Sequence, residues 1–187
     1  AEQCVRFGED TFFSLGALPP QEMITGTVND LVFDLGRQGR RYATGEDVRR
    51  SGILVDALDN VKVAGVPIVP HEAPPKTRGL HALAILAQTT RKPIAWIHIM
   101  DLEMARIAVE VENVLSGGME ELRKRPRHTA LLEAISPLFY DDRVIDLLLY
   151  YAELGLPAFS LGSMPQPGST APMSIPAAIA QNVAEIL

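Results

Sequence analysis

The sequence has a single cysteine, no excess of positive charge and no long apolar run, and each of these features excludes a class of protein. Its 187 residues contain one cysteine, Cys4, which excludes an internal disulfide and leaves no second thiol for a metal site. Lysine and arginine number 17 against 23 aspartate and glutamate residues, a net charge of −6. Because proteins that bind nucleic acid normally present a basic face, we expect no nucleic-acid partner.

Membrane insertion and secretion are disfavoured in the same way. No apolar stretch approaches the ~20 residues needed to cross a bilayer, and no signal-peptide pattern opens the sequence. We therefore expect no membrane partner and a cytoplasmic location. Hydrophobic residues make up 47% of the chain and the mean hydropathy is +0.11, which is enough apolar material for a substantial core.

Strand-like apolar runs alternate with amphipathic helical patterns along most of the chain, which predicts an α/β fold with a parallel sheet. The expected strands are 61–69, 94–98, 130–135 and 158–161. The expected helices are 44–58, 76–89, 102–115, 141–154 and one from about Pro176. Residues 1–43 are expected to form a flanking, irregular segment with one hairpin, and residues 44–187 the βα units.

Four βα units are half of a (β/α)8 TIM barrel, which takes ~250 residues. The sequence also stops inside an apolar helical pattern without a cap. We therefore expect a partial TIM barrel that belongs to a longer protein.

Barrel enzymes place their active sites at the carboxyl ends of the strands. His98 closes the expected 94–98 strand and Trp96 shares its alternation phase, so both are candidates for the barrel interior, with a structural histidine and a core tryptophan as the alternatives. Glu133 lies in an otherwise apolar strand, where a carboxylate needs a partner. Either an ion pair with a neighbouring arginine or contact with a cationic ligand would satisfy it.

The residues that follow the last two strands complete the candidate site. Residues 162–172 form a polar loop rich in glycine and proline, and it exceeds the usual two to six residues of a βα connection. This length favours a functional loop over a plain connection. The candidate binding residues here are Ser136, Tyr140, Met164, Gln166, Ser169 and Thr170.

Several short segments in a fixed order carry a resemblance to a known family. They are residues 40–48, 64–70, 89–93, 136–138, 155–157, 168–172 and 180–187. From residue 40 onward the chain resembles the trimethylamine methyltransferase family of corrinoid-dependent enzymes.

The resemblance implies a TIM barrel that transfers a methyl group from a tertiary or quaternary methylamine to the cobalt of a corrinoid, in methanogenesis and one-carbon metabolism. The corrinoid is carried by a partner protein, so this chain is expected to hold no metal or cofactor permanently, and a homo-oligomer is expected. Trimethylamine-specific members carry a pyrrolysine beyond the matching segments, whereas relatives without it act on quaternary amines. We therefore expect a quaternary amine such as glycine betaine, whose positive charge suits the acidic chain.

Within this interpretation the candidate residues take two roles. Glu133 and His98 are the candidate catalytic residues. The candidate substrate-binding residues are Trp96, Ser136, Tyr140, Met164, Gln166, Ser169 and Thr170.

Two other functions stay open at this point. One is a non-catalytic barrel module for docking or assembly. The other is a metal-dependent barrel hydrolase that uses His71, His98 and Asp101, although the sequence has no His-x-His or His-Glu-x-x-His spacing.

Overall fold

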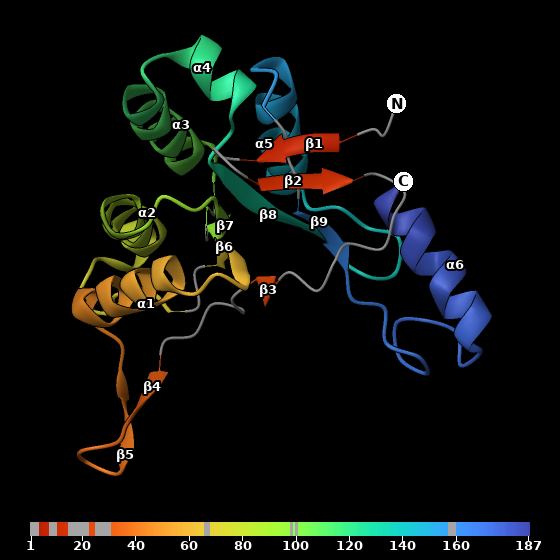
Figure 1. Cartoon of the computed structure of the whole chain (residues 1–187). Helices are drawn as coiled ribbons and strands as arrows, with labels where there is room; N and C mark the ends of the chain where they lie inside the picture. The colour runs from red at the N-terminus through yellow and green to blue at the C-terminus, as the bar shows by residue number, and fades with distance from the viewer. Residues whose placement is uncertain are drawn as a thin grey trace. The chain divides into compact units, whose positions relative to one another are not determined.

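The computed structural model describes residues 4–7, 11–14, 23–24, 31–65, 68–97, 99, 101–156 and 160–187. The chain divides into two compact units, Ala1–Ala130 and Leu131–Leu187. Figure 1 shows the order of the helices and strands along the chain.

A parallel sheet forms the centre of the first unit. Strands β3 (Met23–Ile24), β6 (Val61–Gly65) and β7 (Ile94–Ile97) pair in this order, and β7 pairs in turn with the start of β8 (His128–Ala134). The predicted strands near 61, 94 and 130 are therefore confirmed as parallel neighbours in sequence order.

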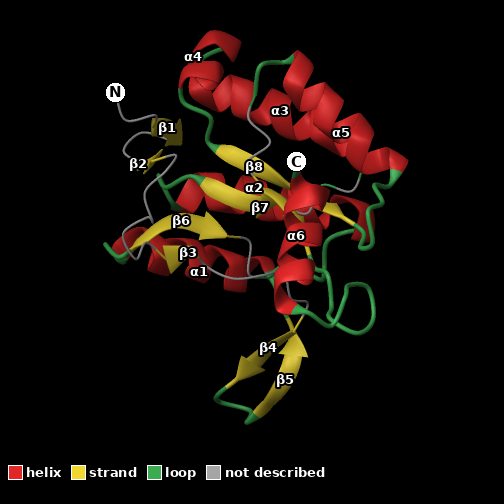
Figure 2. Cartoon of the chain, turned by 90° about the vertical axis from the view of Figure 1, so that its right-hand side faces the viewer, coloured by secondary structure: helices red, strands yellow, loops and turns green. Residues whose placement is uncertain are grey.

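Helices alternate with these strands as the apolar periodicity predicts. Helix α1 (Gly45–Ala57) packs on β6 and on α2 (Arg78–Thr89), which follows a short 3-10 turn (Pro75–Thr77) and packs on β7. Figure 2 shows both helices beside these strands. The first two helices approach closely at Gly52, where any side chain would collide with Thr89.

Helices α3 (Leu102–Ser116) and α4 (Met119–Lys124) follow β7. Gly117, at φ 80°, ends α3 in the left-handed conformation that favours glycine. The charged side chains of α4 are exposed, as their residue types predict. Leu122 is buried and gives this short helix its inward face.

The second unit continues the alternation. The rest of β8 pairs in parallel with β9 (Ser160–Ser163), and α5 (Asp142–Glu153) connects them. Helix α6 (Ile175–Ile186) follows β9 and packs against it. The predicted strand–helix–strand–helix order is confirmed, whereas the described strands close no barrel and the (β/α)8 barrel stays a prediction.

Two antiparallel pairs lie near the start of the chain. Strands β4 (Leu31–Asp34) and β5 (Gly39–Tyr42) form the predicted hairpin, with Val32 opposite Arg41. Strands β1 (Cys4–Phe7) and β2 (Thr11–Ser14) form a second pair, which the sequence analysis did not predict.

The core consists of apolar side chains from both helices and strands. The most completely buried are Tyr151, Leu83, Leu86, Ile94, Leu122, Leu132, Val48 and Val63. Burial of a side chain of this kind stabilises a fold by roughly 1.5–3 kcal/mol. Among the described residues no helix is both long enough and apolar enough to cross a membrane.

Candidate functional site

Strand β8 places Glu133 on the face opposite its two buried neighbours. Leu132 and Ala134 are buried, whereas Glu133 is half-buried, as the alternation of a strand requires. Gly162 of β9 pairs with Glu133, and a Cβ atom at Gly162 would lie 3.5 Å from Glu133 Oε1. No ion pair between described residues includes Glu133, so the predicted arginine partner is not found in that part of the chain.

A tight turn follows the carboxyl end of β8. Ile135 and Phe139 exchange two backbone hydrogen bonds, of 2.8 and 3.1 Å, across a cis Ser136–Pro137 bond. Leu138, at φ 52°, lies in the left-handed region, and its side chain and that of Phe139 are exposed. The turn therefore presents two apolar side chains at the strand end.

Helix α6 holds this turn through the buried side chain of Glu185. Its Oε2 accepts a hydrogen bond from the Ser136 hydroxyl at 2.7 Å. Its Oε1 accepts from the Leu138 N–H at 3.0 Å and from the Gln181 side chain at 2.8 Å. The Tyr140 hydroxyl donates to the Glu185 backbone carbonyl at 2.5 Å. Two of the predicted site residues are thus bound to one residue of α6.

The Glu185 carboxylate is ionised at neutral pH. Burial acts to raise its pKa, but hydrogen bonds from the Leu138 N–H, from the side chains just named and from Ser163 outweigh that effect and bring the pKa to about 2. Only 3% of the residue is exposed, so this charge lies inside the unit.

The predicted loop after β9 has a compact structure of its own. The Gln166 carbonyl accepts backbone hydrogen bonds from Ser169, Thr170 and Ala171, each of 3.0 Å, and the Gln166 N–H donates to Thr170 Oγ1 at 2.9 Å. Gly168 takes φ 84° in this turn. The loop is therefore held largely by its own backbone.

Two further side chains of α6 connect the helix to this loop and to β9. Gln181 Nε2 donates to the Thr170 carbonyl at 2.7 Å, and Asn182 Nδ2 donates to Ser163 Oγ at 2.8 Å. Residues 181, 182 and 185 share one helix face, so α6 joins the ends of β8 and β9.

Apart from Glu133, the predicted site residues fall into three groups. Ser136, Tyr140 and Thr170 hold structural hydrogen bonds at α6 or within the loop. Met164, Gln166 and Ser169 are exposed in the loop. His98 and the side chain of Trp96 lie outside the described part of the chain.

The sequence analysis missed the polar face of α6. We interpreted its sequence as an apolar helix, although Gln181, Asn182 and Glu185 have the i, i+1, i+4 spacing of one helix face. This spacing is the sequence signal from which the polar face of α6 could have been predicted.

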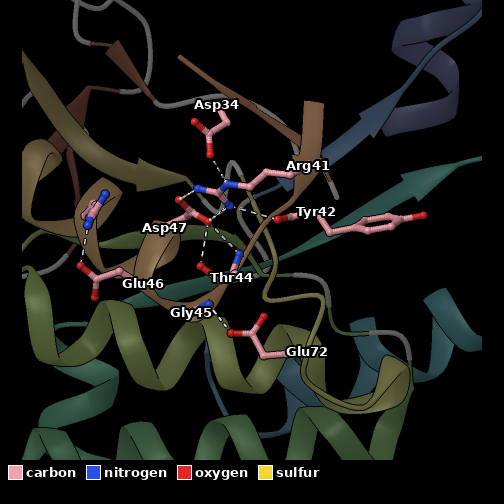
Figure 3. A network of polar contacts seen from close by, with 9 residues as sticks. Asp34, Arg41, Tyr42, Thr44, Gly45, Glu46, Asp47 and Glu72 are labelled. Carbon is pink, nitrogen blue, oxygen red and sulfur yellow. Dashed lines mark hydrogen bonds and ion pairs between the residues drawn. The ribbon is translucent and has the colours of Figure 1, made fainter. Parts of the chain in front are cut away.

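A second polar network joins the β4–β5 hairpin to α1 (Figure 3). Arg41 donates to both oxygens of Asp47 at 2.6 and 2.7 Å and to Asp34 at 3.1 Å. Asp47 also accepts from the backbone N–H of Thr44 at 2.8 Å, which forms part of the capping box of α1. The hydrogen bonds from Arg41 hold the pKa of Asp47 well below its usual range. The role of this network is therefore structural, because its contacts join the hairpin to α1.

The residues proposed for a hydrolase metal site also have structural roles. His71 stacks on Tyr42 with 3.8 Å between ring centroids, and Asp101 caps α3 by accepting from the Met104 N–H at 2.9 Å. Within the part of the chain that the structure describes, no three His, Cys, Asp or Glu side chains are grouped to hold a metal ion.

Comparison with known proteins decides the family. The family model described as trimethylamine methyltransferase (MTTB) matches residues 21–187. The chain belongs to the trimethylamine methyltransferase family. The match includes the β8 turn, the loop after β9 and α6, and it confirms the resemblance carried by the short segments.

Two curated relatives in Desulfitobacterium hafniense are similar to this family member. A glycine betaine methyltransferase of strain Y51 is 29% identical over 149 residues, which cover 79% of this chain and 31% of the relative. The trimethylamine methyltransferase MttB of strain DSM 10664 / DCB-2 is 22% identical over 147 residues, which cover 79% of this chain and 29% of the relative. The chain thus spans a little under a third of the length of these relatives.

Proposed function

We propose that the intact protein transfers a methyl group from a quaternary methylammonium compound of the glycine betaine type to Co(I) of a corrinoid carried by a partner protein. The observation that carries the proposal is the family match over residues 21–187. Glycine betaine is favoured over trimethylamine because identity is 29% to the relative named for the former and 22% to the relative named for the latter.

The reaction makes modest demands on the side chains. The electron pair of Co(I) forms the new bond to carbon, and the electron pair of the C–N bond stays on nitrogen, which leaves as a neutral tertiary amine. A quaternary donor therefore needs no general acid. The protein has to hold the cation in line with the cobalt and exclude water.

Residues at the carboxyl ends of β8 and β9 suit this task. Glu133 is half-buried beside Gly162 and supplies a carboxylate on the face of β8 opposite Leu132 and Ala134. Phe139 is 55% exposed on the turn beyond it and offers an aromatic face, which attracts ammonium groups. We assign contact with the cation to Glu133 and Phe139, and His98 and Trp96 remain candidates from the sequence alone.

The loop after β9 supplies the other wall of the proposed site. Met164 is 69% exposed, and the Gln166 side chain is also exposed, so both are available to a ligand. Ser136, Tyr140 and Thr170 shape the site through the contacts with α6 described above.

Methyl transfer to cobalamin tests the proposal. Full-length enzyme is mixed with Co(I) cobalamin and, separately, with glycine betaine, choline and trimethylamine, and the spectral change to methyl-Co(III) is followed. We expect methylation with a quaternary amine. A non-catalytic docking module would give none, and failure with every amine would overturn the proposal.

A further inference from the structure

The unit that contains the candidate site has almost no positive charge to balance its carboxylates. Residues 131–187 include six aspartate and glutamate residues but only one arginine, Arg143, with no lysine or histidine. That arginine is bound to Asp141 on the surface, with 2.9 Å between Arg143 Nε and Asp141 Oδ1. The other carboxylates of the unit therefore lack a cationic partner from the unit itself.

Glu185 is the residue for which this imbalance matters most. It is 3% exposed, and its carboxylate is held by neutral donors, namely a hydroxyl, an amide and a backbone N–H. These hydrogen bonds offset the cost of burying the charge, but none of the three donors is itself positively charged. No ion pair between described residues includes Glu185, and little water screens a buried charge, so it produces a strong negative potential nearby.

The position of this charge relates it to the candidate site. Two of its donors, Ser136 and Leu138, belong to the turn after β8, and a third, Gln181, also holds the loop after β9. Ligands of parallel α/β sheets bind at the carboxyl ends of the strands. The buried charge therefore lies in direct contact with the turn after β8, which we assign to the candidate site.

We propose that Glu185 is a positioning residue that selects for a cationic substrate. Its buried carboxylate fixes the turn after β8, and its charge favours an ammonium group at the carboxyl ends of β8 and β9 without touching it. Glu185 is 3% exposed and both of its oxygens accept hydrogen bonds from the protein, so we assign its effect to its charge. The inference rests on the function proposed above and adds a residue that sets charge specificity.

The test compares a cation with a neutral molecule of the same shape. Glycine betaine and 3,3-dimethylbutyrate share a carboxylate and three methyl groups, but the first has a positive nitrogen where the second has a neutral carbon. By calorimetry, the full-length wild-type protein should bind glycine betaine at least tenfold more tightly than 3,3-dimethylbutyrate. In Glu185→Gln this preference should fall about tenfold. If the role of Glu185 were purely structural, the substitution would weaken the binding of both ligands equally.

Asp146→Asn is the matched control, because it removes one exposed carboxylate of the same unit from α5. Its cation preference should stay within twofold of the wild-type value. An unchanged preference in Glu185→Gln, or an equal loss in Asp146→Asn, would overturn the inference.

Two further results keep the inference falsifiable. If Glu185→Gln does not fold, the wild-type protein still decides, since absence of a cation preference there contradicts the proposal. Methyl transfer from glycine betaine without that preference would defeat only this inference, whereas no methyl transfer from any amine would defeat the proposed function.

Discussion

At the scale of single residues, the two polar networks depend on carboxylates that must stay ionised. Glu185 and Asp47 each accept several hydrogen bonds, and both have a lowered pKa in the folded protein. A group whose folded pKa is lowered stabilises the fold above its unfolded pKa, and this contribution is lost as the pH falls toward the folded value. Both networks are therefore expected to weaken in acid.

Glu185 gives a prediction with a defined pH window. Its unfolded pKa is about 4.3 and its folded pKa is about 2, so its contribution should disappear as the pH falls through this interval. Thermal unfolding of the full-length protein should show a smaller loss of melting temperature between pH 5 and pH 2 for Glu185→Gln than for wild type. Parallel curves for the two proteins would show that the charge does not contribute.

Asp47→Ala tests the network at the start of α1. The change removes the cap on Thr44 and both hydrogen bonds from Arg41, and we expect the free energy of unfolding in urea to fall by about 2 kcal/mol. The neighbouring Glu46→Ala removes only exposed pairs with Arg49 and Arg50 and should cost much less. Equal losses in the two variants would contradict the assigned role of Asp47.

At the scale of secondary structure elements, local patterns predicted the helix ends, and they predicted the buried face of α3 only in part. Thr44 and Asp141 cap helix starts and Gly117 ends a helix, as their residue types predict. Asp101 caps α3, which was not predicted. In α3, the spacing of Met104, Ala108, Val111 and Leu115 predicts one buried face. Met104 and Ala108 are buried as predicted, whereas Leu115 is 47% exposed, and Ala105, Val109 and Glu112 are buried as well.

Glu112, a buried carboxylate of α3, yields a prediction. The residue is buried in α3, and burial raises its pKa to about 7 although Arg127 acts to lower it. A raised carboxyl pKa destabilises the folded state as the pH rises from about 4.3 through 7. We therefore compare the free energy of unfolding of Glu112→Gln with that of wild type at two pH values. The difference in favour of the variant should be roughly 2 kcal/mol larger at pH 8 than at pH 5. An equal difference at both pH values, measured by urea unfolding, would show that Glu112 does not titrate in this range.

At the scale of the whole molecule, the sequence predicted the course of the chain better than the candidate site. Periodicity is a local property, so the parallel strands at Val61 and Ile94 and the hairpin at Leu31 were predictable. The contact of Ser136 with Glu185 joins residues 49 positions apart. No local pattern contains such a contact, and a mostly apolar helix gave little reason to expect a buried charge.

Family membership extends this account to a reaction. The match over residues 21–187 includes the turn, loop and helix that surround Glu185, so these contacts belong to the region shared with the family. The proposed methyl transfer assigns them a common purpose, which is to hold a cation at the carboxyl ends of β8 and β9.

The most direct test of the central claim measures both products of one reaction. Full-length enzyme, Co(I) cobalamin and glycine betaine are combined, and methyl-Co(III) and dimethylglycine are quantified in the same sample over time. The account predicts that the two products appear in equal amounts, because each methyl group that leaves nitrogen arrives on cobalt. Dimethylglycine released without methyl-Co(III), or neither product from glycine betaine, would contradict it.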